Sequence, residues 1–186
     1  MSLKVERGRT LARSQALQLL FQAEILHRSV DEVLAGDYLL SKGPLAPYAA
    51  ELARGCYDHI DEIDRGLRRV SENWALERMP GPDRNLLRLA VYELRFSPEH
   101  VDDAVVINEA VEIAKAYGTD ESASFVNGVL GRVVRDARIF PHTARTANAP
   151  SASTQEGAQD PEAREAVSAG FDEPVTIDAP LAGEVD

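Results

Sequence analysis

Hydrophobic positions recur along the first 140 residues at the spacing of helices that bury one face. The clearest case covers residues 10–27, where the apolar side chains fall on one side of a helical wheel: Ala12, Ala16, Leu19, Ala23 and Leu26. The same spacing predicts helices over residues 30–40, 48–70, 83–96 and 107–117, and a last one from residue 119 or 120 to about 140. Residues 71–78 either continue the third helix or bend away from it. Sustained strand-type alternation is missing, so the pattern predicts an all-α fold of about seven helices.

Proline and glycine mark the breaks between these helices. SKGPLAP and RMPGPD predict loops, and Ser97 followed by Pro98 ends the fourth long helix. Asp83 caps or opens that helix, and Gly118 is predicted to end the next one as a left-handed cap. Short connections between most of the helices indicate a bundle, or two small bundles packed together.

Composition changes after Phe140, and this changes how the net charge of −11 is interpreted. Residues 146–186 hold one basic and nine acidic side chains, whereas residues 1–145 hold 19 basic and 22 acidic ones. The last segment has four prolines and few large apolar side chains, so it is predicted to be disordered. The chain is therefore divided into a flexible basic arm (1–8), a helical domain (9–140) and an acidic tail (141–186).

Several classes of function are disfavoured by what the sequence lacks. Its single cysteine, Cys56, excludes an internal disulfide and a multi-cysteine zinc site. The four histidines have no metal-type spacing, and the motifs of phosphate-loop, dinucleotide-binding and hydrolase sites are missing. We therefore expect no catalysis, metal or cofactor. No apolar run is long enough for a membrane span and no secretory signal is recognisable, so we expect a cytoplasmic protein.

The arginines at the start of the chain are the first candidates for binding. Arg7, Arg9 and Arg13 lead into an amphipathic helix, and the fork of a guanidinium group suits phosphate oxygens. A solvated basic tail explains the same charges. Phe21 and Phe125 lie beside the core stripe of their helices, and Arg132 lies on the same flank as Phe125. Rings next to guanidinium groups suit single-stranded nucleic acid, although core-edge phenylalanines explain the two positions as well.

A second basic stripe runs along the helix predicted after RMPGPD. Arg84, Arg88 and Arg95 lie on one side of it. The stripe either binds phosphate or a protein partner, or it pairs with acidic neighbours such as Asp83 or Glu77.

Four segments carry a resemblance to a known family. They are LARSQALQLLFQAE, DRNLLRLAVYEL, VVINEAVEIAKAYG and SASFVNGVLGRV, and they occur in the family's order. From about residue 9 to residue 138, the chain resembles the NusB family of bacterial transcription antitermination factors. The resemblance implies two packed three-helix subdomains and no catalysis.

It also implies a function and partners. Family members bind boxA RNA of ribosomal operons together with NusE, a small-subunit ribosomal protein, and act within the RNA polymerase antitermination complex. The resemblance places RNA at Arg7, Arg9 and Arg13, and it implies that Phe21 and Phe125 face either RNA or a partner. It places the NusE partner near Asp83 and the helix that follows, including Arg84 and Arg88. Asn127 and Gly128 look structural, with Gly128 permitting close helix approach. Some members form homodimers that cover the RNA surface.

The chain also departs from the family's pattern. Its basic arm is interrupted by Gly8 and Thr10, and the acidic tail is an addition that could compete with RNA for the arm. Two other functions stay open. One is the RNA-binding part of an rRNA methyltransferase system, which needs a further domain with a cofactor loop. The other is a helical protein-binding module without RNA binding.

Overall fold

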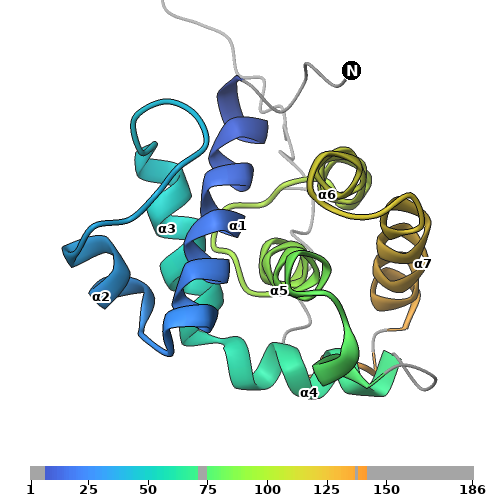
Figure 1. The fold of residues 1–186 in the computed structure, drawn as a ribbon. Coiled ribbons are helices and arrows are strands. Elements are labelled where there is room, and N and C mark those ends of the chain that lie inside the picture. Colours follow the sequence, from blue (N-terminus) through green and yellow to red (C-terminus); the bar gives the residue numbers. More distant parts are fainter. Residues whose placement is uncertain (1–6, 71–74, 137, 142–186) are drawn as a thin grey trace, which may run out of the picture. The chain divides into compact units, whose positions relative to one another are not determined.

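The computed structural model describes residues 7–70, 75–136 and 138–141, and within these ranges it contains seven α-helices and one short 3₁₀ helix (Figure 1). Their bounds are α1 (Gly8–Leu26), α2 (Val30–Ala35), α3 (Pro47–Asp58), α4 (Ile60–Val70), η2 (Leu76–Arg78), α5 (Gly81–Arg95), α6 (Asp103–Tyr117) and α7 (Ser122–Arg135). These described residues form no strand, so the predicted all-α class is confirmed. The expectations for residues 1–6 and for the acidic tail from 142 onward fall outside the described part.

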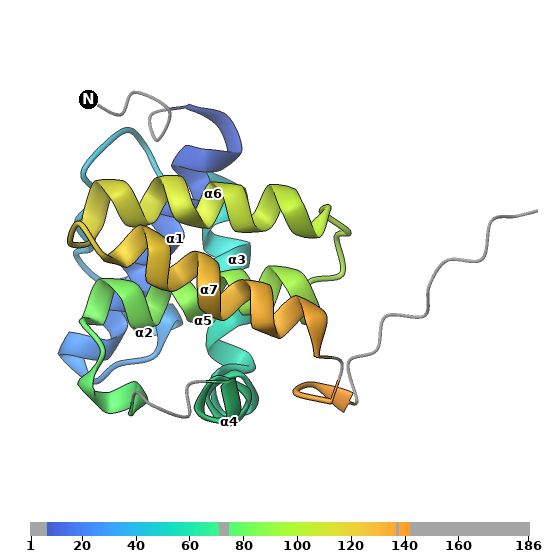
Figure 2. The same cartoon turned by 90° about the vertical axis from the view of Figure 1, so that its right-hand side faces the viewer.

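The helices form two groups of three, as the family resemblance implied. One group consists of α1, α2 and α3, which contact one another, and the other consists of α5, α6 and α7. The central helix α5 also contacts α1 and α3 and so joins the groups (Figure 1). In Figure 2, α6 and α7 lie side by side over α5, and α4 passes at the base of the domain, where it contacts α5 and α7.

Helix α5 is buried on all sides because both groups pack against it. Every residue from 85 to 94 is buried, and Leu87, Val91 and Leu94 are completely inaccessible. A helix in this position is expected to be apolar all round. However, α5 also buries four polar or charged side chains: Asp83, Asn85, Arg88 and Glu93. Buried polar groups are costly without partners, and each of these four is bonded to a neighbour.

The pair formed by Arg13 and Glu93 joins α1 to α5 in the interior. The Nε and Nη2 atoms of Arg13 each donate to a different Glu93 carboxylate oxygen at 2.8 Å. Burial acts to lower the pKa of Arg13, but the hydrogen bonds and charge of Glu93 outweigh it and raise the pKa. This two-pronged geometry is the strongest form of ion pair that side chains make.

A second ionic cluster joins α1, α4 and α5. The Arg88 guanidinium donates to both Asp64 oxygens at 2.8 Å, and its Nη1 lies 3.3 Å from Glu24 Oε1. Arg84 Nε donates to Glu24 Oε1 at 2.8 Å, and the Asn85 amide donates to the other Glu24 oxygen. Burial acts to raise the pKa of Glu24, but Asn85 and the two arginines hold it below its ordinary value.

The predicted helix over residues 48–70 is two helices, because the chain breaks at His59. Neither glycine nor proline lies at the break. Instead, the His59 ring packs against Phe96 with ring centres 4.8 Å apart, and its Nδ1 lies 2.8 Å from the Gly55 carbonyl oxygen. The break therefore coincides with a ring contact to Phe96, the residue after α5, which local sequence does not encode.

Helix α2 ends at Ala35, five residues before its predicted end, because three α1 glutamines hold the following loop. Gln15 Nε2 donates to the carbonyls of Lys42 and Pro44 at 3.0 and 2.9 Å, and its Oε1 accepts from the Ala46 N–H at 2.9 Å. Gln18 and Gln22 bond the main chain of Ser41 and Leu39 in the same way. Main-chain groups bonded to side chains are withdrawn from a helix ladder.

Other predicted helix ends also differ: α6 begins at Asp103 and not at residue 107, and α7 ends at Arg135 and not near residue 140. Asp83 lies inside the first turn of α5, which begins at Gly81. Gly118 is not a left-handed cap, because its φ of −98° and ψ of −168° are extended. Glycine is needed there for space, since a Cβ atom would lie 2.4 Å from the Ser122 Cβ.

Replacing Gln15 with Met tests the contacts that hold the loop. The variant keeps the side-chain volume and removes three partly buried hydrogen bonds to the loop's main chain, so we expect a loss of about 2–4 kcal/mol in the free energy of unfolding. Gln22→Met is the matched control, since water replaces its exposed bonds, and we expect a loss below about 1 kcal/mol. Urea unfolding measures both. Equal losses would contradict the role given to Gln15.

Glu24→Gln tests the second ionic cluster through pH. Because folding lowers the pKa of Glu24, its carboxylate stabilises the fold above the unfolded pKa, and this stabilisation disappears as pH falls through the folded pKa. We expect the variant to lose about 1–3 kcal/mol at pH 7. The difference from wild type should shrink as pH is lowered through the acidic range. Urea titrations over that range measure it, with exposed Glu51→Gln as a control, and a difference independent of pH would refute the mechanism.

Candidate nucleic-acid interface

The start of α1 presents two of the three predicted arginines on the surface. Arg7 precedes the first turn of the helix and is exposed. Arg9 is exposed over 54% of its side chain and forms an ion pair with Glu99. Its guanidinium carbon lies 4.9 Å from the centre of the Tyr48 ring. An exposed ion pair of this kind is weak, so the guanidinium of Arg9 can be transferred to a phosphate at low cost.

Tyr48 is a candidate that the sequence reasoning missed. It lies in the first turn of α3, and its hydroxyl donates to Glu93 Oε1 at 3.1 Å. Burial and the Glu93 charge raise the pKa of Tyr48, so the phenol stays neutral and its position is fixed by that bond. This ring lies beside Arg9 because α3 packs on α1, and no residue spacing along the chain predicts that proximity.

Arg13 differs from the expectation of a phosphate ligand. Only 3% of the residue is exposed, and its guanidinium is bound to Glu93 and lies 3.5 Å from Glu109. A guanidinium in this position cannot reach a ligand on the surface. Arg13 instead stabilises the interior beneath Arg9. It binds Glu93, and Glu93 in turn accepts a hydrogen bond from the hydroxyl of Tyr48, the ring beside Arg9.

The two predicted phenylalanines, Phe21 on α1 and Phe125 on α7, both lie near the first turn of α5. Phe21 is half-buried against Gly81, where a Cβ atom would approach its Cε2 to 2.6 Å. Phe125 is half-buried at the edge of the core, one turn beyond Ser122, whose hydroxyl donates to Asp83 at 2.8 Å. Both rings therefore present part of their surface and are held by packing on the other part.

The structure does not bring the predicted arginines and phenylalanines together on a single surface. Arg9 and Phe21 are twelve residues apart on one helix, which corresponds to about 18 Å along its axis. Near the N-terminus of α1, the aromatic partner of Arg9 is Tyr48. The candidate interface thus has an arginine–tyrosine part at the start of α1 and a phenylalanine part at the start of α5.

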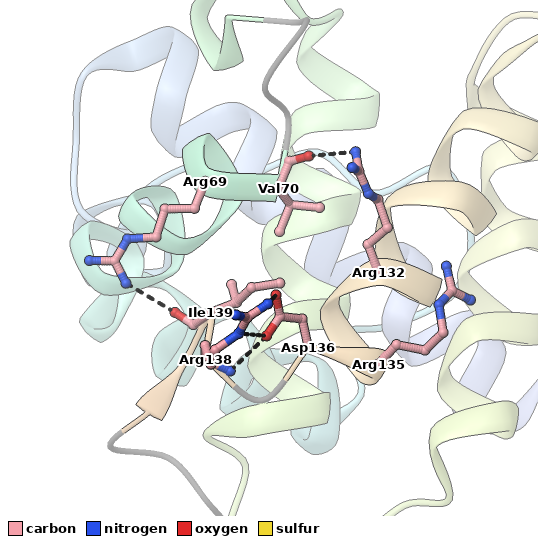
Figure 3. Close-up of a pocket in the computed structure, with 7 residues that line it drawn as sticks. All are labelled: Arg69, Val70, Arg132, Arg135, Asp136, Arg138 and Ile139. Carbon is pink, nitrogen blue, oxygen red and sulfur yellow. Dashed lines mark hydrogen bonds and ion pairs between the residues drawn. The ribbon is translucent and has the colours of Figure 1, made fainter.

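Arg132 lies exposed near the end of α7 and lines an open groove. Its Nη1 donates to the Val70 carbonyl at 3.0 Å, at the end of α4 (Figure 3). Between Phe125 and Arg132, Asn127 and Gly128 are also exposed. A Cβ atom at Gly128 would meet nothing within 4 Å, so the expected close helix approach at this glycine is absent.

The residues expected to face a protein partner are engaged inside the domain. Asp83 and Arg88 are buried, with 4% and 8% of each residue exposed. Asp83 accepts from Ser122, and Arg88 pairs with Asp64 and Glu24. Arg84 is half-buried and pairs with Glu24. Arg84 and Arg88 therefore pair with acidic neighbours, as one of the two interpretations of the sequence expected, but these neighbours are Glu24 and Asp64 and not Asp83 or Glu77. Arg95 donates to the Val133 carbonyl at 2.8 Å.

Other kinds of site find no support in the part of the chain that is described. There, no group of three or more histidine, cysteine or acidic side chains is arranged to hold a metal ion. Cys56 is buried, and burial strongly raises the pKa of its thiol. None of the described helices has the length and apolar character needed to cross a membrane.

Comparison with known proteins identifies relatives over most of the helical domain. The NusB family model matches residues 10–135. The transcription antitermination protein NusB of Desulfitobacterium hafniense is 47% identical over 132 residues, which cover 68% of this chain and 88% of the relative. The protein of the same name from Salinispora arenicola is 45% identical over 133 residues, covering 70% of this chain and 97% of the relative.

Solved structures agree with this. NusB of T. maritima has a TM-score of 0.60 and 35% identity, over 73% of this chain and 99% of that one. A crystal structure of the antitermination factors NusB and NusE in complex with dsRNA matches with a TM-score of 0.55 and 28% identity, over 68% of this chain and 96% of that one. The extent of the family match and the identity to these relatives show that the chain belongs to the NusB family.

Proposed function

We propose that the protein is a non-catalytic, RNA-binding transcription antitermination factor that acts in the cytoplasm. The observation that carries the proposal is the match to the NusB family over residues 10–135, together with 47% identity to a transcription antitermination protein. The proposed RNA is the boxA element of ribosomal operons, and the proposed protein partners are NusE and the RNA polymerase antitermination complex. A related structure that contains NusB, NusE and dsRNA supports this set of partners.

The size of the relatives favours this function over a methyltransferase system. The matched region covers 88% and 97% of the two antitermination proteins, so these relatives consist almost entirely of the helical domain. A methyltransferase needs an additional domain for its cofactor. The size of these relatives therefore supports antitermination rather than a methyltransferase system.

In this proposal, the start of α1 holds the phosphate backbone of the RNA. The exposed guanidinium groups of Arg7 and Arg9 bind phosphate. When Arg9 moves away from the Tyr48 ring to contact the RNA, the face of that ring becomes accessible and stacks on a base. Phe21 and Phe125 provide further ring surface at the start of α5. Arg13 contributes by fixing Glu93, and through it the hydroxyl of Tyr48.

Binding of boxA RNA to Arg9→Gln tests the phosphate role. Each phosphate contact to a single strand contributes about −0.7 to the slope of log affinity against log salt, so the variant should show a slope shallower by about 0.7. Fluorescence anisotropy measures this, with and without NusE. Arg54→Gln is the control, because Arg54 is an exposed arginine paired with Asp31 on another part of the surface. An unchanged slope in Arg9→Gln would exclude the contact.

Tyr48→Phe and Tyr48→Leu separate stacking from structure. The Phe variant keeps a ring and should retain RNA affinity apart from a small loss, whereas the Leu variant should lose about 1–3 kcal/mol of binding free energy. Urea unfolding of both variants serves as the control for stability. If the two variants bind equally well while Leu alone is destabilised, Tyr48 has only a structural role.

A further inference from the structure

An open groove of about 880 Å³ lies between the C-terminal ends of α4 and α7. Figure 3 shows Arg69 extending from α4 on one side, with Arg132 and Arg135 extending from α7 on the other. Val70 and Ile139 supply the apolar part of the lining. Asp136 and Arg138 complete it, so four arginines face the groove with a single carboxylate.

Most of this positive charge is not neutralised by the protein. Both Asp136 oxygens accept from Arg138, at 2.9 and 3.0 Å, so the groove's carboxylate is already paired. Among the described residues, Arg69, Arg132 and Arg135 have no carboxylate partner. Arg69 and Arg132 each donate one bond to a main-chain carbonyl, of Ile139 and Val70. A guanidinium has five N–H donors, so these side chains keep most of their donor capacity.

The helix ends explain only part of this arrangement. Positive side chains in the last turn of a helix interact favourably with its dipole, and Arg69, Arg132 and Arg135 occupy such positions. The dipole does not account for the lack of acidic partners. At other helix contacts, Arg13, Arg84 and Arg88 are paired with carboxylates, whereas Arg95 donates to main-chain carbonyls. The groove brings together three guanidinium groups, those of Arg69, Arg132 and Arg135, that remain available to an anion from outside.

The groove continues a strip of exposed surface along α7. Phe125, Gly128, Arg132 and Arg135 are spaced by three, four and three residues, so they follow one face of the helix. Gly128 leaves open space in the middle of this strip. A ring at one end and guanidinium groups at the other are the elements that follow a single nucleic-acid strand.

We propose that this groove is a second site for the phosphodiester backbone of RNA, which takes up the strand beyond the part bound at the start of α1. The inference rests on the function proposed above. The groove is open and lined from two helices, so it fits an extended polyanion. Because guanidinium groups bind phosphate oxygens independently of the base, this contact adds affinity to any sequence that adjoins the recognised element.

The test uses the full chain with Arg132→Gln and Arg135→Gln combined. Two RNAs are compared by anisotropy: a boxA RNA of about 12 nucleotides and one extended to about 30 nucleotides. We expect the double variant to bind the longer RNA about tenfold more weakly, with a salt slope shallower by about 1.4, and to bind the short RNA as wild type does. The matched control combines Arg54→Gln and Arg68→Gln, two exposed arginines that pair with Asp31 and Glu77.

A second variant pair tests the path along α7 without disturbing the fold. Side chains at Gly128 meet open space, so Gly128→Glu and Gly128→Gln should both fold, as unfolding experiments will show. We expect Glu to weaken binding of the longer RNA several-fold relative to Gln, because it puts a negative charge on the strip. Equal binding by the two variants would overturn the proposed path.

The other outcomes are equally decisive. Unchanged binding of the longer RNA by the double variant overturns the inference, and so does an equal loss with both RNAs. A gain in RNA affinity would show that the groove arginines do not hold RNA, and would also overturn it. Arg9→Gln separates the two proposals: if it weakens short-RNA binding while the groove variant changes nothing, only the groove inference fails.

Discussion

The structure depends on a constraint set by α5, which lies at the centre of the domain and carries charge into it. Asp83, Asn85, Arg88 and Glu93 are all buried, so each requires a partner on another helix. These partners are Arg13 and Glu24 of α1, Asp64 of α4 and Ser122 of α7. A shift of α5 relative to these helices would leave charges unpaired in the interior. The ionic contacts therefore fix how the two groups of helices meet.

The same constraint determines which charged side chains are available for binding. Arg13 and Arg88 look on the sequence like members of basic clusters, but α5 and its neighbours use both internally. Arg7 and Arg9 at the start of α1, and the groove arginines at the carboxyl ends of α4 and α7, remain on the surface. The acidic net charge of the chain therefore conceals local regions of positive surface.

The sequence predicted most of the helices, since a buried stripe repeats every three to four residues regardless of its partner. It did not predict the break at His59, which comes from ring contacts with Phe96. It also did not predict the early end of α2, where the loop's main chain is bonded to α1 glutamines that lie between 17 and 31 residues earlier in the sequence. For the interface, charge and periodicity selected Arg9 correctly as a surface residue, but they also selected Arg13. The position of Arg13 on a helical wheel does not show that the Glu93 carboxylate of α5 binds it in the interior. Tyr48 gave no local signal.

The loop between α2 and α3 is held in an unusual way, with consequences for how the protein can change. Gln15, Gln18 and Gln22 contact its backbone, while the side chain of Leu39 is left outside, with 79% of the residue exposed. The path of the loop thus depends on residues of α1 and on the loop's own apolar side chains that pack against the core, Tyr38, Leu40 and Leu45. Positions between these anchors, such as Leu39, are free to change, so a new specificity can arise there without loss of the underlying architecture.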